Sequence, residues 1–231
     1  MTIQEIIDNA LIKEQEEKQK RVRSGKFSPS SFGRCYRMQF WNRKNEPQTN
    51  PPDVEALRRF KVGNIIHDYM QSFFPQAQRE VKILVADDII GFADIVLADE
   101  VVDIKSCRTF EFKQMVKPDY NIGISKRTNC LQVASYAYFL NKPQARLIFI
   151  EKDALDSREF VLQIKDWKEA IEDELTILRG HWLRNELPKA LPRAYNGKEG
   201  NYCSFQLKCL SLGWDCINKK SVSRPSCGGV D

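Results

Sequence analysis

The sequence has no long apolar run and no apolar leader. No stretch approaches the roughly 18 consecutive apolar residues that a membrane-spanning helix requires. The first 20 residues carry several Glu, Asp and Lys where a signal peptide has an apolar core. Repeats and low-complexity tracts are absent too. We therefore expect an intracellular, cytoplasmic protein with no membrane segment.

The composition fits one globular domain or slightly more. The chain has 231 residues, of which 42% are hydrophobic and 29% charged, which is enough for a single sizeable core. Lys and Arg outnumber Asp and Glu by 36 to 31, and this excess favours a polyanionic partner without identifying one. The seven cysteines are an odd number, and in a reducing compartment they favour thiolates bound to a metal or cluster over disulfides.

Hydrophobic spacing divides the chain into helical and extended segments. It predicts helices near the start of 2–24, over 35–41, from Asp53 to about Phe73, over 127–141 and over 167–182. Short runs of β-branched and apolar residues predict strands over 81–85, 89–97, 101–106, 146–151 and 158–164. Hydroxyl side chains in 28–31 are expected to cap the second helix. On the third helix we expect these residues to face the core: Leu57, Phe60, Ile65, Ile66, Tyr69 and Phe73.

Charged residues interrupt two of the expected strands. Asp94, Asp103 and Lys105 lie within apolar runs, although strand interiors normally exclude Asp and Lys. If Ala98 and Asp99 form a two-residue hairpin loop, paired residue numbers sum to 197 and Asp94 lies directly opposite Asp103. Lys105 follows two residues later, so its side chain projects from the same face as that of Asp103.

Facing carboxylates repel each other, so this pair needs a compensating cation, a raised pKa on one acid, or open solvent. A divalent metal would supply the cation, and oxygen ligands favour magnesium or manganese. An imidazole ligand would shift the preference toward manganese, and His67 is the candidate for it. The alternative for His67 is an ordinary surface or core residue, which is the commoner role of a lone helical histidine. The alternative is a hairpin whose three charged residues form a solvated polar face.

Four blocks of residues follow one another in a recognisable order between residues 28 and 140. They are Ser28-Pro29-Ser30-Ser31 with Cys35 and Arg37; Gly63-Asn64-Ile65-Ile66-His67; Gly91 to Asp94 with Asp103-Ile104-Lys105; and Gln132 to Tyr136, with Glu80 at the start of the first core strand. In this order they resemble the RecB-like branch of the PD-(D/E)XK nuclease superfamily, including its CRISPR adaptation and AddB-type members.

The resemblance implies an α/β fold with a restriction-endonuclease-like core, in which helices flank a central mixed sheet. It implies that His67, Asp94, Asp103 and the carbonyl of Ile104 hold Mg²⁺ or Mn²⁺, while Lys105 orients or activates the attacking water. Glu80 is expected to assist catalysis through a second metal or a water molecule.

The resemblance also suggests DNA contacts. Gln132 and Tyr136 are four residues apart and share one helix face, where they would contact the DNA backbone or brace the lysine; plain amphipathic packing is the alternative. Arg37 lies in a run of basic and aromatic residues over 36–43, which would guide a DNA strand or belong to the core.

The cysteine pattern resembles that of family members with a 4Fe-4S cluster, which have one Cys before the nuclease core and three after it. Here Cys35 precedes the core, and Cys203, Cys209 and Cys216 follow it. The tail reads C-x5-C-x6-C instead of C-x2-C-x5-C. Four thiolates would bind a 4Fe-4S cluster or Zn²⁺ and clasp the chain ends together; unligated buried thiols are the third alternative.

We therefore expect a charged N-terminal helix over 1–27, a RecB-like nuclease domain over 28–216 with its core at 60–165, and a polar tail over 217–231. The expected function is that of a metal-dependent DNA exonuclease acting at DNA ends or in single strands, in repair, recombination or phage DNA processing. A sequence- or structure-specific endonuclease and a non-cutting DNA-binding or assembly protein are the alternatives. The resemblance further suggests a helicase, an integrase or another recombination protein as partner.

Overall fold

The computed structural model describes residues 1–213. Its strands are β1 (Gln78–Val85), β2 (Ile89–Val96), β3 (Glu100–Cys107), β4 (Gln144–Glu151) and β5 (Ser157–Gln163). Its α-helices are α1 (Ile3–Lys20), α2 (Tyr36–Arg43), α3 (Val54–Gln71), α4 (Thr109–Met115), α5 (Ile122–Ser125), α6 (Arg127–Phe139), α7 (Lys168–Leu183) and α8 (Gln206–Ser211). Short 3₁₀ helices are η1 (Pro29–Ser31), η2 (Ile164–Asp166) and η3 (Tyr195–Tyr202).

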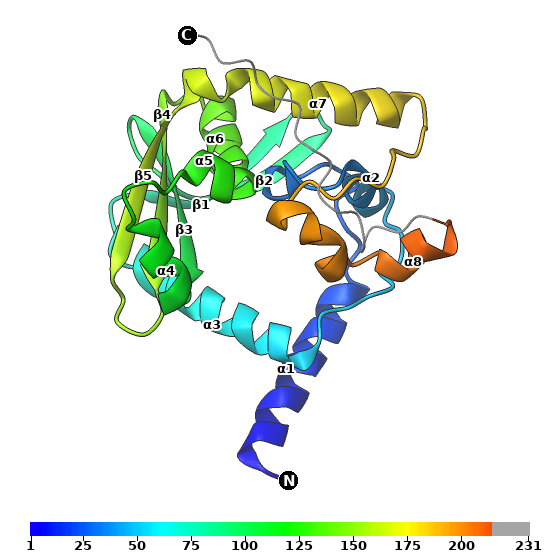
Figure 1. Cartoon of the computed structure of the whole chain (residues 1–231), viewed down its shortest axis with the longest axis horizontal. Coiled ribbons are helices and arrows are strands. Elements are labelled where there is room, and N and C mark those ends of the chain that lie inside the picture. Colours follow the sequence, from blue (N-terminus) through cyan, green and yellow to red (C-terminus); the bar gives the residue numbers. More distant parts are fainter. Residues whose placement is uncertain (214–231) are drawn as a thin grey trace.

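The strands form one sheet with the order β1-β2-β3-β4-β5, and helices flank it (Figure 1). The sheet is mixed, because β3 and β4 pair in parallel while the other neighbouring strands are antiparallel. This arrangement confirms the expected α/β fold with a central mixed sheet flanked by helices.

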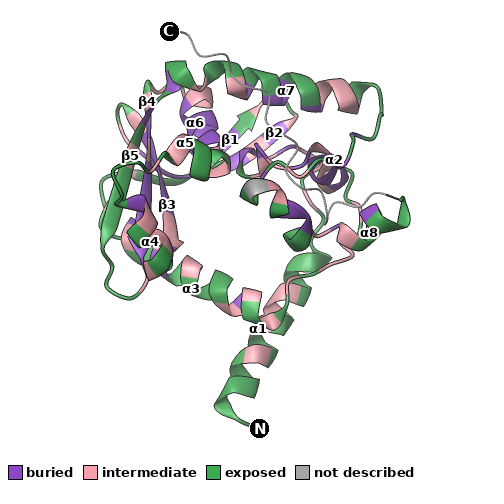
Figure 2. Ribbon diagram, in the orientation of Figure 1, coloured by how far each residue is buried: buried purple, intermediate pink, exposed green. Residues whose placement is uncertain are grey.

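Different helices cover the two faces of the sheet. The main core lies between α6, α7 and one face, and the purple ribbons of Figure 2 mark the buried parts of α6 and β4. On the opposite face, α3 packs through Ile66 onto a cluster made of Ile95, Val102, Ile104, Ile148 and Ile150. Because side chains of β3 alternate, Val101 and Asp103 point to the α6 side while their neighbours point toward α3.

The expected hairpin register is confirmed. Ile95 pairs with Val102 and Val96 with Val101, so paired numbers sum to 197 as a two-residue loop requires. The pairing of β2 with β3 stops at Ile95 and Val102, and the next position along the hairpin is that of Asp94 and Asp103. The strands therefore separate where the sequence predicted two facing carboxylates.

The expected cap of the second helix is wrong. Residues 28–31 form the separate 3₁₀ helix η1, and α2 begins only at Tyr36, with Cys35 as its N-cap residue and without a side-chain hydrogen bond at the cap. The hydroxyl of Ser28 contacts that of Ser30 at 2.8 Å instead. The segment thus supplies a tight turn before α2.

The expected core face of the third helix is also largely wrong. Leu57 and Ile66 are buried, as predicted. The large side chains of Phe60, Ile65, Tyr69 and Phe73 are more than half exposed. Helical spacing alone could not show that α3 touches the sheet along a narrow stripe only.

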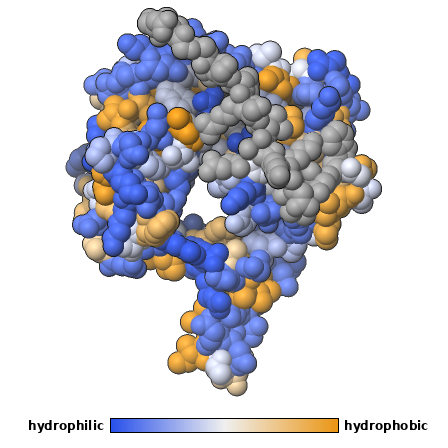
Figure 3. Space-filling model, viewed as in Figure 1, coloured by the Kyte–Doolittle hydropathy of each residue, from blue (hydrophilic) through white to orange (hydrophobic). Residues whose placement is uncertain are grey.

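Helix α1 extends away from the rest of the molecule (Figure 1). All of its side chains are exposed or half-buried, and Figure 3 shows apolar side chains along its free end, where Ile3 and Ile6 lie exposed. Ion pairs from Asp8 to Arg58 and from Glu14 to Lys61 join α1 to α3. Among residues 1–213, no helix has both the length and the apolar character needed to cross a membrane.

Gly91 explains how three of the sequence blocks meet in space. A Cβ atom at Gly91 would lie 2.6 Å from a ring carbon of Tyr136 and 3.3 Å from Cδ of Pro29. The absence of a side chain on β2 therefore lets the ring of α6 and the proline of η1 approach the strand. The blocks form one packed unit behind the site.

Replacing Gly91 by alanine should lower the free energy of unfolding by about 1–3 kcal/mol, because the methyl group overpacks a buried contact. Urea unfolding monitored by circular dichroism measures the change. Gly180→Ala, in the last turn of α7, is the matched control; its methyl group meets only the flexible end of Arg184 and should be neutral or stabilising. Equal unfolding free energies for Gly91→Ala and the wild type would contradict this packing.

Candidate metal and phosphodiester site

Asp94 lies at the point where β2 and β3 separate. Its Oδ2 accepts a hydrogen bond of 3.0 Å from the backbone amide of Ile104, so the side chain replaces a missing rung of the ladder. The same oxygen is 2.9 Å from Nε2 of His67 on α3. Asp94 thus joins the two strands to the helix that covers them.

Glu80 completes a three-residue set with Asp94 and His67. One ligand atom from each of these residues lies within 4.8 Å of the other two, the spacing of groups that can share a metal ion. Glu80 comes from β1. Its neighbours Arg79 and Val81 pair with Ile95 and Ala93 on β2, so Glu80 lies at the position opposite Asp94. Three different elements therefore bring these donors to one point.

The backbone of Glu80 is strained. Its φ of 50° lies in the left-handed region, which a glutamate in the middle of a strand seldom adopts. Such conformations cost about 1–3 kcal/mol and persist where the surrounding structure enforces them. Here the strained residue offers its carboxylate to the three-residue set.

Gln71 holds this set together, and sequence analysis missed it. It is 7% exposed, and its Nε2 donates to Oε1 of Glu80 at 2.8 Å and to the carbonyl of Asp94 at 3.2 Å. The same nitrogen lies 3.4 Å from Nε2 of His67. The signal was available, because Gln71 follows His67 by four residues and so shares its helix face.

A buried ion pair lies beside the set. Lys105 Nζ donates to Oδ1 of Asp103 at 3.0 Å, and Nε2 of Gln132 donates to the same oxygen at 3.1 Å. Asp103 has no exposed surface. Its Oδ2 is 2.8 Å from the ammonium but outside hydrogen-bond geometry, so among the described residues this buried oxygen is an unsatisfied acceptor.

The electrostatics follow from burial and from the neighbouring charges. Burial raises the pKa of Asp103 to about 6, although the ammonium of Lys105 opposes this. Burial lowers the pKa of Lys105, but the charges of Asp103 and Asp94 outweigh it and hold that pKa above its usual value. Burial raises the pKa of Asp94, but the hydrogen bond from His67 and the charge of Lys105 outweigh burial, so the pKa of Asp94 lies below its usual value. His67 donates a hydrogen bond to the carboxylate of Asp94, and this bond raises the pKa of His67.

The residues fit a hard divalent cation. Carboxylates of Glu80 and Asp94 and the imidazole of His67 are suitable donors for Mg²⁺ or Mn²⁺. Asp103, also predicted as a ligand, is not part of this three-residue set; it is bound by Lys105 and by Gln132 of α6. Excess negative charge in a buried place needs such compensation. Lys105 lies next to these donors, where an ammonium can meet an anionic substrate.

The other predicted residues are placed as follows. Ile104 enters the site through its amide, which binds Asp94; a metal contact of its carbonyl stays a prediction. Gln132 braces Asp103 instead of Lys105. Tyr136 is 2% exposed and hydrogen-bonds the backbone of Phe92. The predicted DNA contacts of Gln132 and Tyr136 stay predictions, and the placement of Tyr136 does not support one.

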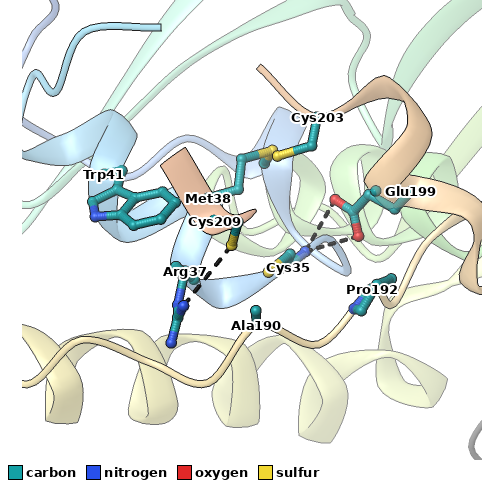
Figure 4. A pocket seen from close by; sticks show the side chains of 10 residues that line it. Cys35, Arg37, Met38, Trp41, Ala190, Pro192, Glu199, Cys203 and Cys209 are labelled. Carbon is teal, nitrogen blue, oxygen red and sulfur yellow. Dashed lines mark hydrogen bonds between the residues drawn. The ribbon is translucent and has the colours of Figure 1, made fainter. Parts of the chain in front are cut away.

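A second candidate site is a small cavity between the two ends of the described chain. Cys35, Cys203 and Cys209 line it, together with Met38, Trp41 and Glu199 (Figure 4). The three thiols come from the N-cap of α2, the end of η3 and α8. Packing of the N-terminal against the C-terminal segment is therefore as expected, while Cys216 and the tail over 217–231 lie outside the described residues.

Buried polar groups fix this cavity. The carboxylate of Glu199, 1% exposed, accepts from the amide of Cys35 at 3.0 and 3.1 Å. Arg37 is 3% exposed; its Nε donates to the carbonyl of Pro188 at 2.6 Å and its guanidinium approaches Sγ of Cys209 at 3.8 Å. A DNA contact of Arg37 stays a prediction that this placement does not support.

Three thiols around one cavity fit a metal or cluster by donor type. The cavity has a volume of about 10 Å³, which is about the room of one water molecule. Within residues 1–213 the three sulfur atoms do not all lie within 4.8 Å of one another, whereas thiolates around zinc, with Zn–S distances of about 2.3 Å, lie about 3.8 Å apart. The spacing is wider than a zinc site needs.

No protein-family model matches the chain, and no curated protein matches it significantly. Among solved structures, the crystal structure of SSO0001 is similar over 90% of this chain and 96% of its own, with 20% identity and a TM-score of 0.54. At this identity the likeness shows a shared fold alone.

Two further structures are less similar. An alkaline exonuclease from Laribacter hongkongensis, LHK-Exo, matches 73% of this chain and 96% of its own with 12% identity and a TM-score of 0.46. A phage-related exonuclease from Haemophilus somnus 129PT matches 55% of this chain and 71% of its own with 11% identity and a TM-score of 0.43. At these TM-scores the likeness establishes neither a shared fold nor a shared activity.

Manganese should stabilise the protein, by about 2.7 kcal/mol when free Mn²⁺ is 100 times its Kd. Glu80→Gln removes a donor and Gln71→Leu removes its support, so each should weaken Mn²⁺ binding by roughly 10- to 100-fold. Calorimetric titration of the full chain measures the affinities. Glu55→Gln, which changes an exposed carboxylate near the start of the same helix α3, is the control and should bind Mn²⁺ like the wild type. The site is refuted if Glu80→Gln and Gln71→Leu bind Mn²⁺ as tightly as Glu55→Gln.

Proposed function

We propose that the protein is a metal-dependent deoxyribonuclease that hydrolyses phosphodiester bonds at DNA ends or in single strands. The observation that carries this proposal is the convergence of His67, Glu80 and Asp94 beside the buried pair of Asp103 and Lys105. The RecB-like branch, suggested by the order of the sequence blocks, is part of the proposal. The biological setting we propose is DNA repair, recombination or phage DNA processing, with a helicase, integrase or other recombination protein as partner.

The residues divide the work of such a reaction. A divalent cation held by His67, Glu80, Asp94 and Asp103 would lower the pKa of a water molecule and offset the charge of the phosphate. Lys105 presents its ammonium to the attacking water or to a phosphate oxygen. Asp103 fixes that ammonium, and Gln132 fixes Asp103 from α6.

The two alternatives from the sequence make different predictions. An endonuclease on the same core would cut circular DNA, whereas an exonuclease needs an end. A non-cutting DNA-binding protein has no need for a half-buried lysine held by a fully buried aspartate, because the aspartate is expensive to bury. The geometry therefore favours an enzyme, and DNA with blocked ends distinguishes the two cutting modes.

Asp103→Asn and Lys105→Met should each reduce cleavage of labelled linear DNA by roughly 100- to 1,000-fold in Mg²⁺ or Mn²⁺, because Lys105 offsets charge at the reacting phosphate and Asp103 holds its ammonium in place. Gel assays of single- and double-stranded DNA, with free or blocked ends, measure the rates. Lys165→Met, an exposed lysine on η2, controls for loss of positive charge.

Circular dichroism must show that both variants remain folded. Wild-type cleavage that stops when ends are blocked supports the exonuclease. Cleavage of closed circles would replace it by the endonuclease, and undiminished cleavage by both variants would remove these residues from the mechanism.

We also propose that the cysteine cavity binds a 4Fe-4S cluster through Cys35, Cys203 and Cys209, with Cys216 as the fourth ligand. The convergence of the three described thiols on one cavity supports this proposal, and Zn²⁺ is the alternative. Since the cavity has the size of a water molecule, cluster binding requires the segments around it to move apart. A cluster there would join α2 to the C-terminal segment.

Protein purified without oxygen should contain about four iron atoms per chain and show visible absorbance that dithionite bleaches. Cys35→Ser and Cys209→Ser should lose the iron. Cys130→Ser is the matched control, because Cys130 is also buried but contacts the carbonyl of Ile122. Zinc in place of iron would support the alternative, and neither metal in the wild type would leave three unligated thiols.

A further inference from the structure

The face of the sheet that carries the metal set is not fully covered by α3. On β1 and β2, Val81, Ile83, Ile89 and Ala93 belong to the main core. The alternate residues point to the opposite face, where Leu84 is 51% exposed and Phe92 49% exposed. Lys82 pairs directly with Phe92 in the ladder and is exposed too. We call Lys82, Leu84 and Phe92 the hairpin platform.

The hairpin platform is continuous with the metal set. Phe92 and Lys82 each lie two residues from a proposed metal ligand, Asp94 on β2 and Glu80 on β1, on the same face of the sheet. Two residues span about 7 Å along a strand, which is the length of about two stacked nucleotides at 3.4 Å per base. A DNA strand with one phosphate at the metal set would therefore place a neighbouring base over the ring of Phe92.

The platform is held rigidly from behind. The backbone of Phe92 hydrogen-bonds the buried hydroxyl of Tyr136, and the ring of Tyr136 packs against Gly91. These two contacts anchor the backbone of β2 beneath the Phe92 ring to the main core. The main core thus supports the ring, which itself contributes little to the core.

We infer that the hairpin platform binds single-stranded DNA next to the scissile phosphate, with a base stacked on Phe92, the sugar edge against Leu84 and a phosphate at Lys82. This inference rests on the proposed function. An exposed aromatic ring beside a lysine is the combination that binds single strands without reading their sequence. A paired base offers no free face to the ring, so the platform favours a frayed or single-stranded end.

Binding should be measured with the full chain carrying Asp103→Asn, in Mg²⁺, by fluorescence anisotropy of a labelled single-stranded oligonucleotide. Adding Phe92→Ala should weaken binding by about 5- to 100-fold, the range for loss of one stacked base, and Phe92→Trp should restore it. Val161→Ala, an exposed apolar residue on the far edge strand β5, should leave binding unchanged. Lys82→Ala should make the slope of the logarithm of the binding constant against the logarithm of the salt concentration shallower by about 0.7, because one phosphate contact is lost.

A set of oligonucleotides with one abasic position each gives the sharper test. At the position that stacks on Phe92, loss of the base should weaken binding of the Phe92 protein but not of the Phe92→Ala variant. At every other position, the loss of binding free energy caused by the missing base and the loss caused by Phe92→Ala should be additive. If they add at every position, or if Phe92→Ala binds as tightly as its parent, the platform does not bind a base.

Hydrolysis of a small phosphodiester distinguishes a failure of the hairpin platform to bind DNA from a failure of the proposed nuclease function. With Mn²⁺, the otherwise wild-type protein and Phe92→Ala should hydrolyse bis(p-nitrophenyl) phosphate at equal rates, while only Phe92→Ala loses activity on DNA. A wild type that cleaves neither substrate would refute the nuclease. A wild type that cleaves both, with Phe92→Ala unchanged on DNA, would refute the platform alone.

Discussion

The close approach of Asp94 and Asp103 is the constraint on which the rest of the site depends. Two carboxylates that lie across a hairpin repel each other, and both are almost fully buried. The structure answers this in two ways. Asp94 turns between the strands to accept the amide of Ile104 and a hydrogen bond from His67, while Asp103 is held on the α6 side by Lys105 and Gln132. The strands thus separate at the position where the two carboxylates lie.

The sequence predicted the parts of this arrangement that local geometry determines. Register in a two-residue hairpin follows from counting, so the pairing of Ile95 with Val102 and of Val96 with Val101 could be predicted without a structure. The predicted pairing of Asp94 directly opposite Asp103 is not part of this ladder, because the two strands separate there. The alternation of side chains likewise placed Lys105 beside Asp103, and their ion pair is observed. These conclusions needed only neighbouring residues, and they are correct for that reason.

Predictions that depended on how distant elements meet were less successful. The apolar positions of α3 have helical spacing, but only the contact with β3 and β4 decides which of them are buried, and Tyr69 and Phe73 are left exposed. Gln71 acquires its partners only when α3 lies against β1. For Arg37 the sequence left a DNA contact and a place in the core open, because nothing in its neighbourhood of the chain shows that Pro188 and Cys209 will enclose it.

Several of the sequence blocks have a structural role as well as a chemical one, and this links the two candidate sites. Gly91 admits Pro29 and Tyr136 to the back of β2. Four residues after Pro29, the amide of Gly33 donates to the buried carboxylate of Glu174 on α7 at 2.6 Å, and the amide of Cys35 donates to Glu199. One short segment therefore connects the strand that carries Asp94 to the wall of the cysteine cavity. Since each of these contacts is buried and buried contacts are closely packed, this segment holds the strand of Asp94 and the wall of the cavity in one packed unit.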